Sequence, residues 1–219
     1  MTENKLSEKQ EDKRNDEEYW LAKEEAIIPL LVNLADYGFV VDHDCCRRGW
    51  TDDPRVHLRR GVAERLQQAR DKLQPGQNFR VLDGWRPWSL QKAASEDARR
   101  QIVEAHPDWT AVQIDSQIQI MAPPARIVPL FGSHRYGGAV DLTIIGPNGN
   151  DLEMGVPVNY VIGPEAALLH YEFRDNLTEQ ERVGRQNRRI LLRAMEAAGF
   201  DPYLPEYWHW SHVDDIIMR

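Results

Sequence analysis

A histidine and an aspartate flank a pair of glycines in the stretch GSHRYGGAVDLTI, residues 132–144. Imidazole nitrogens and carboxylate oxygens are both common zinc ligands. Gly137 and Gly138 allow a sharp turn, so His134 could fold back over a strand that carries Asp141. Taken alone, such a stretch is more typical of a surface turn that leads into a strand, and a metal site would need another ligand from elsewhere in the chain.

The C-terminal stretch PEYWHWSH offers that ligand. Glu206 and His209 stand three positions apart among three large aromatic residues. Burying a carboxylate and an imidazole there is unfavourable unless both are paired or bind a metal. His134, Asp141 and His209 would supply two nitrogens and one carboxylate oxygen, a three-ligand zinc set that leaves the fourth position for water. Glu206 would then be a base near that water and not a ligand.

A third cluster, LDGWRPW at residues 82–88, contains a single cation. Asp83-Gly84 is typical of a turn, and Pro87 restrains the backbone that follows Arg86. Two interpretations stay open at this point. Arg86 could simply stack on a neighbouring indole, or it could hold a fixed guanidinium in a cleft, where it would stabilise a developing oxyanion.

Composition limits the class of protein. A chain of 219 residues is enough for one sizeable domain, and its net charge of −8 argues against nucleic acid and anionic membranes as partners. Cys45 and Cys46 are adjacent, so they cannot form a disulfide framework and are typical of reduced thiols in the cytosol. The N-terminus has no apolar signal region, and no apolar run approaches the roughly 20 residues of a membrane span. We therefore expect a cytoplasmic protein.

Hydrophobic periodicity predicts a mixture of helices and strands without regular alternation. This pattern favours an α+β fold, a single domain with a small antiparallel or mixed sheet flanked by helices. Residues 1–18 are highly charged and are predicted to be a disordered tail, with the folded domain over 19–219. The predicted elements are a partly helical segment 24–39 interrupted at Pro29, a loop 42–57, a helix around 62–73, a strand 78–84, helices 88–105 (with Ser89 as a possible N-cap) and 109–121, a strand 139–146 followed by a hairpin turn 147–150, a helix 183–198, and a strand 206–213.

Several well-known catalytic patterns are missing from the sequence. It contains no G-x-S-x-G elbow, no P-loop and no G-x-G-x-x-G phosphate cradle, which disfavours serine hydrolases and nucleotide-dependent enzymes. A H-E-x-x-H helix is also absent, and Glu-x-x-His occurs once where di-iron bundles need it twice.

Three motifs, DGWRP, SHRYGGAVD and EYWH, occur in this order over roughly residues 60–213. In order and spacing they resemble the zinc D-Ala-D-Ala dipeptidases, the family that includes the vancomycin-resistance dipeptidase. The resemblance implies one zinc ion per chain with His134, Asp141 and His209 as ligands, Glu206 as catalytic base and Arg86 as the residue that stabilises the transition state. It also implies a small dipeptide substrate and the α+β zinc peptidase fold shared with D,D-carboxypeptidases and the hedgehog signalling domain.

Two departures from the family pattern leave the substrate open: the residue at position 159, and the segment 162–186, which is longer than in the resistance enzymes. The resistance enzymes carry an acidic residue that helps to hold the substrate's ammonium group, and Asn159 stands at the corresponding position here. Ser133, next to the histidine, is a further candidate for substrate binding. The alternatives are a D,D-carboxypeptidase acting on peptidoglycan stem peptides, a non-catalytic zinc-stabilised binding domain, or a globular protein without metal. Glu206 and Arg86 favour catalysis, because a structural metal site needs neither. The sequence does not indicate an oligomeric state.

Overall fold

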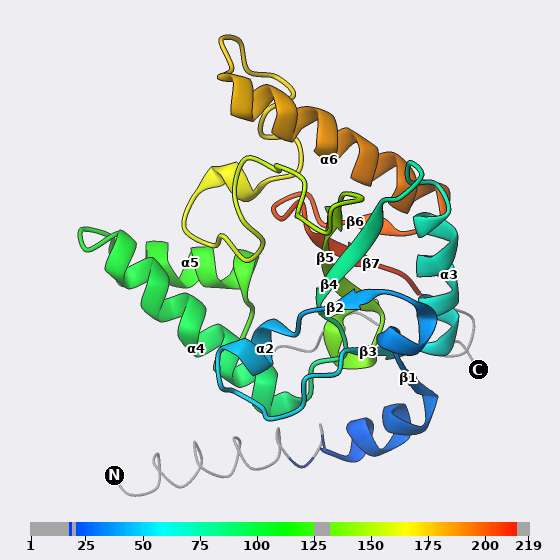
Figure 1. Cartoon of the computed structure of the whole chain (residues 1–219). Coiled ribbons are helices and arrows are strands. Elements are labelled where there is room, and N and C mark those ends of the chain that lie inside the picture. The colour runs from blue at the N-terminus through cyan, green and yellow to red at the C-terminus, as the bar shows by residue number, and fades with distance from the viewer. Residues whose placement is uncertain (1–17, 19–20, 125–131, 214–219) are drawn as a thin grey trace, which may run out of the picture.

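The computed structural model describes residue 18 and residues 21–124 and 132–213. The predicted tail, residues 1–18, lies almost entirely outside this part of the chain. Figure 1 shows helices on both sides of a small central sheet. The helices are α2 (Asp44–Arg47), α3 (Arg60–Arg70), α4 (Trp88–Ala105), α5 (Ala111–Met121) and α6 (Glu179–Ala197), and the strands are β1 (Leu31–Asn33), β2 (Val40–Val41), β3 (His57–Arg59), β4 (Asn78–Asp83), β5 (Ala139–Ile145), β6 (Asp201–Pro202) and β7 (His209–Ser211).

The main sheet of the described residues has the strand order β2-β4-β5-β7-β6. Its pairs are antiparallel except for the parallel pair β2–β4, and β1 and β3 form a separate antiparallel pair. Strand β5 is central and buried along its whole length. Because successive side chains of a strand point to opposite faces, β5 divides its residues between two layers of the protein.

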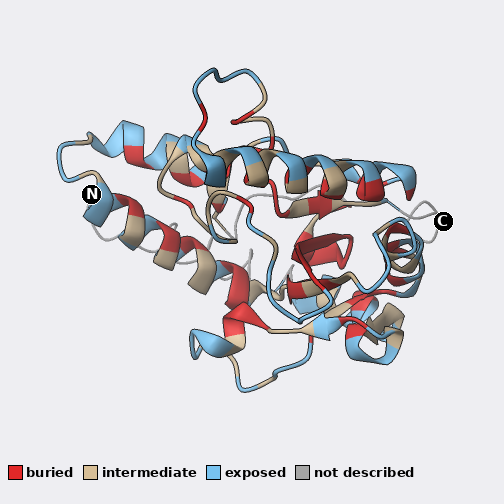
Figure 2. Cartoon of the chain, turned by 45° about the horizontal axis from the view of Figure 1, so that its top comes forward, coloured by how far each residue is buried: buried red, intermediate tan, exposed pale blue. Residues whose placement is uncertain are grey.

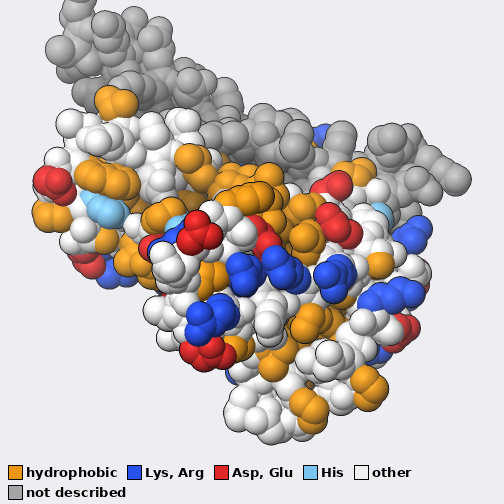
Figure 3. Space-filling view, turned by 90° about the horizontal axis from the view of Figure 1, so that it is seen from above, with side chains coloured by type: hydrophobic (Ala, Val, Ile, Leu, Met, Phe, Trp, Pro, Cys, Tyr) orange, Lys and Arg blue, Asp and Glu red, His pale blue; other side chains and the backbone are white. Residues whose placement is uncertain are grey.

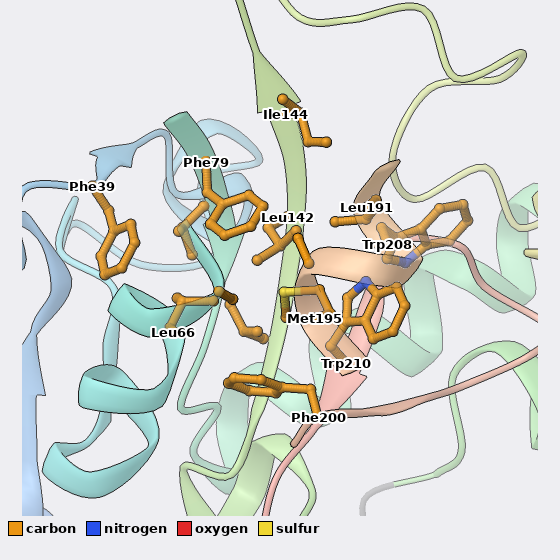
Figure 4. Packing of buried hydrophobic residues seen from close by; sticks show 14 of the residues in the cluster. Phe39, Leu66, Phe79, Leu142, Ile144, Leu191, Met195, Phe200, Trp208 and Trp210 are labelled. Carbon is orange, nitrogen blue, oxygen red and sulfur yellow. The ribbon is translucent and has the colours of Figure 1, made fainter. Parts of the chain in front are cut away.

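One face of the sheet packs against α3 and α6 to form the main core. Val140, Leu142 and Ile144 of β5 belong to this cluster. Figure 4 shows Leu142 close to Met195 of α6 and Trp210 of β7, with Leu66 of α3 on the other side. Burial colours show the same pattern, with red stripes on the inner sides of the helices and blue on the outer sides (Figure 2).

On the opposite face of β5, the buried polar residues Asp141 and Thr143 lie between Ala139 and Ile145. Helices α4 and α5 pair through their own small apolar cluster, and they lie away from α3 in Figure 1. Their residues form one wall of a cavity whose floor includes Asp141. The sheet therefore separates the main apolar core from a cavity into which buried polar groups such as Asp141 point.

A β-bulge in β4 brings a second aspartate to the cavity side. Val81 pairs with Leu142, but Asp83 pairs with Asp141, so two steps along β4 match one step along β5. Such an extra residue switches which face the following side chain occupies. Without it, Asp83 would point with Phe79 and Val81 into the core.

The outer surface of α6 is rich in ion pairs. Arg182 contacts Glu179, and Arg189 contacts Glu172 on the preceding segment. Figure 3, viewed from above, shows basic and acidic side chains lying side by side on this face. Such exposed pairs contribute little to stability, and they mark α6 as a solvated helix with one buried side.

The predicted α+β class and single domain architecture are confirmed, as are the helices that became α3, α4, α5 and α6 and the strands that became β4 and β5. The predicted turn after β5 also forms, because Asp151 returns to bridge Ile145. Within the described residues, no helix is both long and apolar enough to span a lipid bilayer.

The segment 24–39 is partly helical and interrupted at Pro29, as predicted: the α-helix extends to residue 27, a 3-10 turn Ile28–Leu30 follows, and then come strand β1 and the 3-10 turn Leu34–Tyr37. Three predictions of local structure are wrong in part. The loop 42–57 contains the single-turn helix α2. Ser89 does not cap α4, because Pro87 occupies the N-cap position and the N–H of Trp88 donates to the Glu24 carboxylate at 2.5 Å. The predicted strand 206–213 is shorter, since only residues 209–211 are extended in β7.

Candidate metal centre and active site

Sheet register aligns three polar residues across three strands. Asp83 of β4 is the cross-strand partner of Asp141 in β5, and Asp141 is the partner of His209 in β7. Directly paired residues share a face of the sheet, so all three side chains point to the cavity side. Trp210, the next residue of β7, consequently points into the core beside Val140.

His134 joins this row from a short 3-10 turn, residues His134–Tyr136, that precedes β5. Gly137 follows with φ of +65° and ends the turn. A Cβ atom at Gly137 would lie 3.0 Å from Leu31 Cδ2, so glycine is needed for both conformation and space. The turn returns the chain so that the N–H of Gly138 donates to the carbonyl of Ser133. The predicted reversal of the chain between His134 and Asp141 is thus confirmed.

The three predicted ligand residues converge on one point. His134 Nε2 lies 3.2 Å from Asp141 Oδ2 and 3.1 Å from His209 Nδ1, and His209 Nδ1 lies 3.1 Å from Asp141 Oδ1. Zinc–ligand bonds of about 2.0–2.1 Å require ligand atoms about 3.3 Å apart in a tetrahedron. The chemistry and the spacing of this donor set therefore fit a tetrahedral divalent metal ion.

Hydrogen bonds orient both imidazole rings. His134 Nδ1 lies 2.7 Å from the carbonyl oxygen of Gly84, which can only accept, so Nδ1 carries the proton and Nε2 has a free lone pair. His209 Nε2 lies 3.4 Å from Ser211 Oγ, and the other ring nitrogen, Nδ1, is directed toward Asp141. Metal-binding histidines commonly fix their second nitrogen in this way. Position 84 requires glycine, because a Cβ atom there would lie 2.4 Å from the backbone oxygen of His57. The absence of a side chain thus lets the backbone of Gly84 pack against His57 and present its carbonyl to His134.

Electrostatics favour the metal-binding protonation states of His209 and Asp141. Burial lowers the pKa of His209, which favours the neutral imidazole. Burial alone would raise the pKa of Asp141, but His134 and His209 outweigh it and hold that pKa below its usual value. Asp141 is therefore a carboxylate, and a cation between it and the two imidazoles would be strongly attracted.

Glu206 reaches the same point because of a turn that the sequence did not indicate. In a continuous strand, residues 206 and 209 would face opposite sides of the sheet. Instead the N–H of His209 donates to the Glu206 carbonyl at 3.2 Å, and the closed turn places Glu206 Oε2 3.9 Å from His209 Nδ1. Burial and the charge of Asp141 raise the pKa of Glu206 well above its usual value, although Arg86 opposes them. Such a carboxyl group is suited to carrying a proton.

Arg86 lies over the other side of the ligand group. Its Nη2 is 2.5 Å from Asp83 Oδ2 and 3.3 Å from Asp141 Oδ2, and its Nη1 donates to Gln91 Oε1 at 3.2 Å. The guanidinium is thus fixed by polar groups in the cavity wall, which favours the second interpretation of the LDGWRPW cluster over stacking on an indole. Burial alone would raise the pKa of Asp83, but Arg86 and then His43 lower it to about 2.

The two predicted substrate-binding residues line the same cavity, which measures about 480 Å³. The Ser133 hydroxyl is shielded from solvent and has no hydrogen-bond partner among the described residues. A buried hydroxyl of this kind is available to a ligand. Asn159 takes a left-handed backbone conformation with φ of 63°, and its amide donates to Asp44 Oδ2 at 2.8 Å. Among the described residues, no side-chain hydrogen bond joins Ser133 or Asn159 to the three ligand residues.

Sequence analysis missed some residues that shape the site. Asp83 was predicted to be part of a turn, whereas it holds Arg86, and the Asp-x-x-Arg spacing was the available signal. Gln91 holds Arg86 from α4, and Asp44 places a carboxylate beside Asn159. Nothing in the local sequence marks those two residues. His212 points away from the site and contacts the Gly199 carbonyl through Nδ1 at 2.7 Å.

Comparison with known proteins identifies the family of this chain. A family model described as D-Ala-D-Ala dipeptidase matches residues 39–219, which includes every residue of the site. A curated protein of Synechocystis sp., the "D-alanyl-D-alanine dipeptidase", is 27% identical over 173 residues, which cover 73% of this chain and 70% of that protein. The expected resemblance is confirmed, and the chain belongs to the D-Ala-D-Ala dipeptidase family of peptidases.

Proposed function

We propose that this protein hydrolyses the dipeptide D-Ala-D-Ala to two D-alanine molecules and uses one zinc ion per chain. The observation that carries the proposal is the triangle formed by His134, Asp141 and His209, with a buried carboxyl group and a fixed guanidinium beside it. A zinc ion held by those three side chains would supply a Lewis acid that acidifies water and polarises the scissile carbonyl.

Glu206 acts as the general base and then as the general acid. Its carboxylate accepts a proton from the attacking water and passes it to the amine that leaves. The buried position of Glu206 favours the protonated form, so the second transfer is facilitated by the same surroundings that raise its pKa. A residue with this role contributes roughly 10²–10⁴ in turnover.

Arg86 stabilises the oxyanion that forms when the carbonyl is attacked. Asp83 and Gln91 hold its guanidinium in place before the substrate arrives, so little reorganisation is needed during the reaction. Ser133 and Asn159 contact the substrate from the cavity wall. The amide of Asn159 is neutral, and it donates to the Asp44 carboxylate, which is itself paired with Arg47 and Arg48.

The location proposed for the protein is the cytoplasm. Cys45 and Cys46 are free thiols, as expected in a reducing compartment. The substrate that we expect the protein to meet in that compartment is a small dipeptide.

Metal analysis combined with a substrate panel tests the function. The purified protein should contain one zinc ion per chain at the three-residue site and should cleave D-Ala-D-Ala faster than L,D- or L,L-dipeptides. Glu206→Gln should keep its zinc and lose at least about a hundredfold in turnover. His134→Ala should lose the zinc, whereas His212→Ala, which removes a histidine outside the site, should behave like the wild type.

Each alternative has its own outcome in this experiment. Loss of zinc from Glu206→Gln would make Glu206 a ligand and contradict its role as base. Cleavage of a peptidoglycan stem pentapeptide without cleavage of the dipeptide would identify a D,D-carboxypeptidase. A zinc-loaded protein that cleaves no peptide would be a binding domain.

A further inference from the structure

A second group of metal-ligand side chains lies beside the first. Among the described residues, His43, Cys45 and Asp83 offer ligand atoms within 4.8 Å of one another, and all three are buried. Cys45 Sγ lies 3.6 Å from Asp83 Oδ2, and His43 Nε2 lies 3.8 Å from Asp83 Oδ1. His43 precedes the single-turn helix α2, Cys45 lies within it, and Asp83 ends β4. The segments are thus held together by the fold and not by sequence proximity.

The ring of His43 is oriented as a ligand would be. Its Nδ1 lies 2.8 Å from the carbonyl oxygen of Asp53, which can only accept, so Nδ1 carries the proton. Nε2 then faces the Asp83 carboxylate. The two groups lie 3.8 Å apart, so a divalent cation bound between them would take the place of a proton on Nε2 and would be held by both the imidazole and the carboxylate. His134 is held in the same manner by the carbonyl of Gly84.

The spacing and the donor types suit a thiophilic ion. Zinc bonds of about 2.3 Å to sulfur and 2.0–2.2 Å to oxygen place those two atoms about 3.5 Å apart in a tetrahedron. The Cys45–Asp83 distance of 3.6 Å agrees with this value. Sulfur and imidazole ligands select zinc and its heavier relatives over magnesium or calcium. Cys45 and Asp83 also line the cavity, so an ion can reach them from solvent.

We propose that His43, Cys45 and Asp83 form a second metal site, separate from the His134–Asp141–His209 centre, for a thiophilic divalent cation such as Zn²⁺ or Cd²⁺. On binding, the Cys45 S–H bond is replaced by a sulfur–metal bond and the proton is released to solvent. Arg86 lies closer to Asp83, at 2.5 Å, than to Asp141, at 3.3 Å, so its positive charge opposes a cation more strongly at the second site, which is the weaker of the two.

Occupancy of the second site has a consequence for catalysis, which rests on the proposed function. Asp83 is shared, because its Oδ2 accepts both from Arg86 and from Cys45. A cation bound to Asp83 neutralises part of the carboxylate charge and so weakens the ion pair between Asp83 and Arg86. An excess of Zn²⁺ should therefore inhibit turnover through the second site, without displacing the first ion.

Titration of metal-free protein with Cd²⁺ tests the site directly. We expect two equivalents to bind, the weaker one accompanied by the ultraviolet charge-transfer absorption of a cadmium–thiolate bond. Cys45→Ser should bind one equivalent without that absorption, whereas Cys46→Ser is the matched control and should resemble the wild type. His43→Gln should keep the thiol but bind the second equivalent at least tenfold more weakly. Thermal melts without metal should show that each variant is folded.

Two results would overturn the proposal. One is a single equivalent of Cd²⁺ in the wild type, and the other is a thiolate absorption that persists in Cys45→Ser or disappears in Cys46→Ser. His134→Ala separates this proposal from the proposed function, because it should lose the catalytic ion and keep the cadmium–thiolate absorption. Relief of Zn²⁺ inhibition in Cys45→Ser but not in Cys46→Ser would support the link to Arg86, and equal inhibition of both variants would refute it.

Discussion

Replacing Arg86 with alanine should lower both the turnover and the free energy of unfolding, and each effect can be predicted on its own. The guanidinium contacts both Asp83 and Asp141 and faces the cavity in which the carbonyl oxygen would become charged. Loss of one oxyanion donor lowers turnover by about 10²–10³. Arg86 is not a ligand, and its removal takes a positive charge away from Asp141, so the variant should bind metal at least as well as the wild type.

The stability effect follows from the burial of the pair. The side chains of Arg86 and Asp83 are 12% and 3% exposed. Removing one partner of a buried ion pair typically destabilises a protein by about 3–5 kcal/mol. The lower value applies here because Asp83 still accepts a hydrogen bond from the N–H of Gly84. For a domain of this size, about 3 kcal/mol corresponds to a decrease in Tm of about 6–12 °C.

Four proteins are compared to check these effects: the wild type, Arg86→Ala, Asp83→Asn and the double variant. Steady-state kinetics and metal content test the loss of turnover, and thermal melts test the loss of stability. The double variant has no unpaired buried charge, so it should regain about 1–2 kcal/mol relative to Arg86→Ala while its turnover stays low. A metal-loaded Arg86→Ala variant with normal turnover would refute the oxyanion role. A double variant as unstable as Arg86→Ala would refute the argument from unpaired charge.

Gly137→Ala forces a side chain into a left-handed conformation 3.0 Å from Leu31 Cδ2, so it should destabilise by at least about 1–2 kcal/mol and reduce metal content by displacing His134; a melt and a metal assay that match the wild type would contradict this. Ser133→Ala removes a buried hydroxyl without a partner among the described residues, from a residue that lines the cavity, so KM for the dipeptide should rise about fivefold at unchanged metal content, and an unchanged KM would exclude the contact. The pKa of Asp83 is about 2 against 3.8 when unperturbed, so metal-free protein gains about 2 kcal/mol from it above pH 4 and loses this as the pH falls through about 2. Urea unfolding between pH 5 and 2 should therefore depend less on pH in Asp83→Asn, and equal slopes would disprove the assignment.

Local sequence patterns predicted the parts of the fold that local physics determines. The apolar spacing of Val62, Leu66 and Ala69 indicated α3, and these residues are buried in the core. The run AVDLTII indicated a strand, and its burial on both faces explains why it lacks simple alternation. The three segments of the candidate site were also chosen from residue types, and the structure places them around one point.

Tertiary contacts determine what the sequence analysis missed. The carboxylate of Glu24 satisfies the first N–H of α4 from far along the chain, so a local search for a capping serine chose Ser89 wrongly. The bulge that turns Asp83 toward the cavity depends on pairing with β5, and no residue in the strand signals it. Likewise, the turn at Glu206 interrupts a stretch whose aromatic residues favour a strand.

The arrangement of the ligands along the chain also bears on how the protein folds. His209 joins His134 and Asp141 only when β7 adds to the edge of β5, after a separation of 68 residues from Asp141. Contacts this distant in sequence close late and slowly, because the entropy of a long loop must be overcome first. Under the proposed function, metal capture would therefore be a late event in folding, because a chain still being synthesised would present only two of the three proposed ligands until β7 has formed.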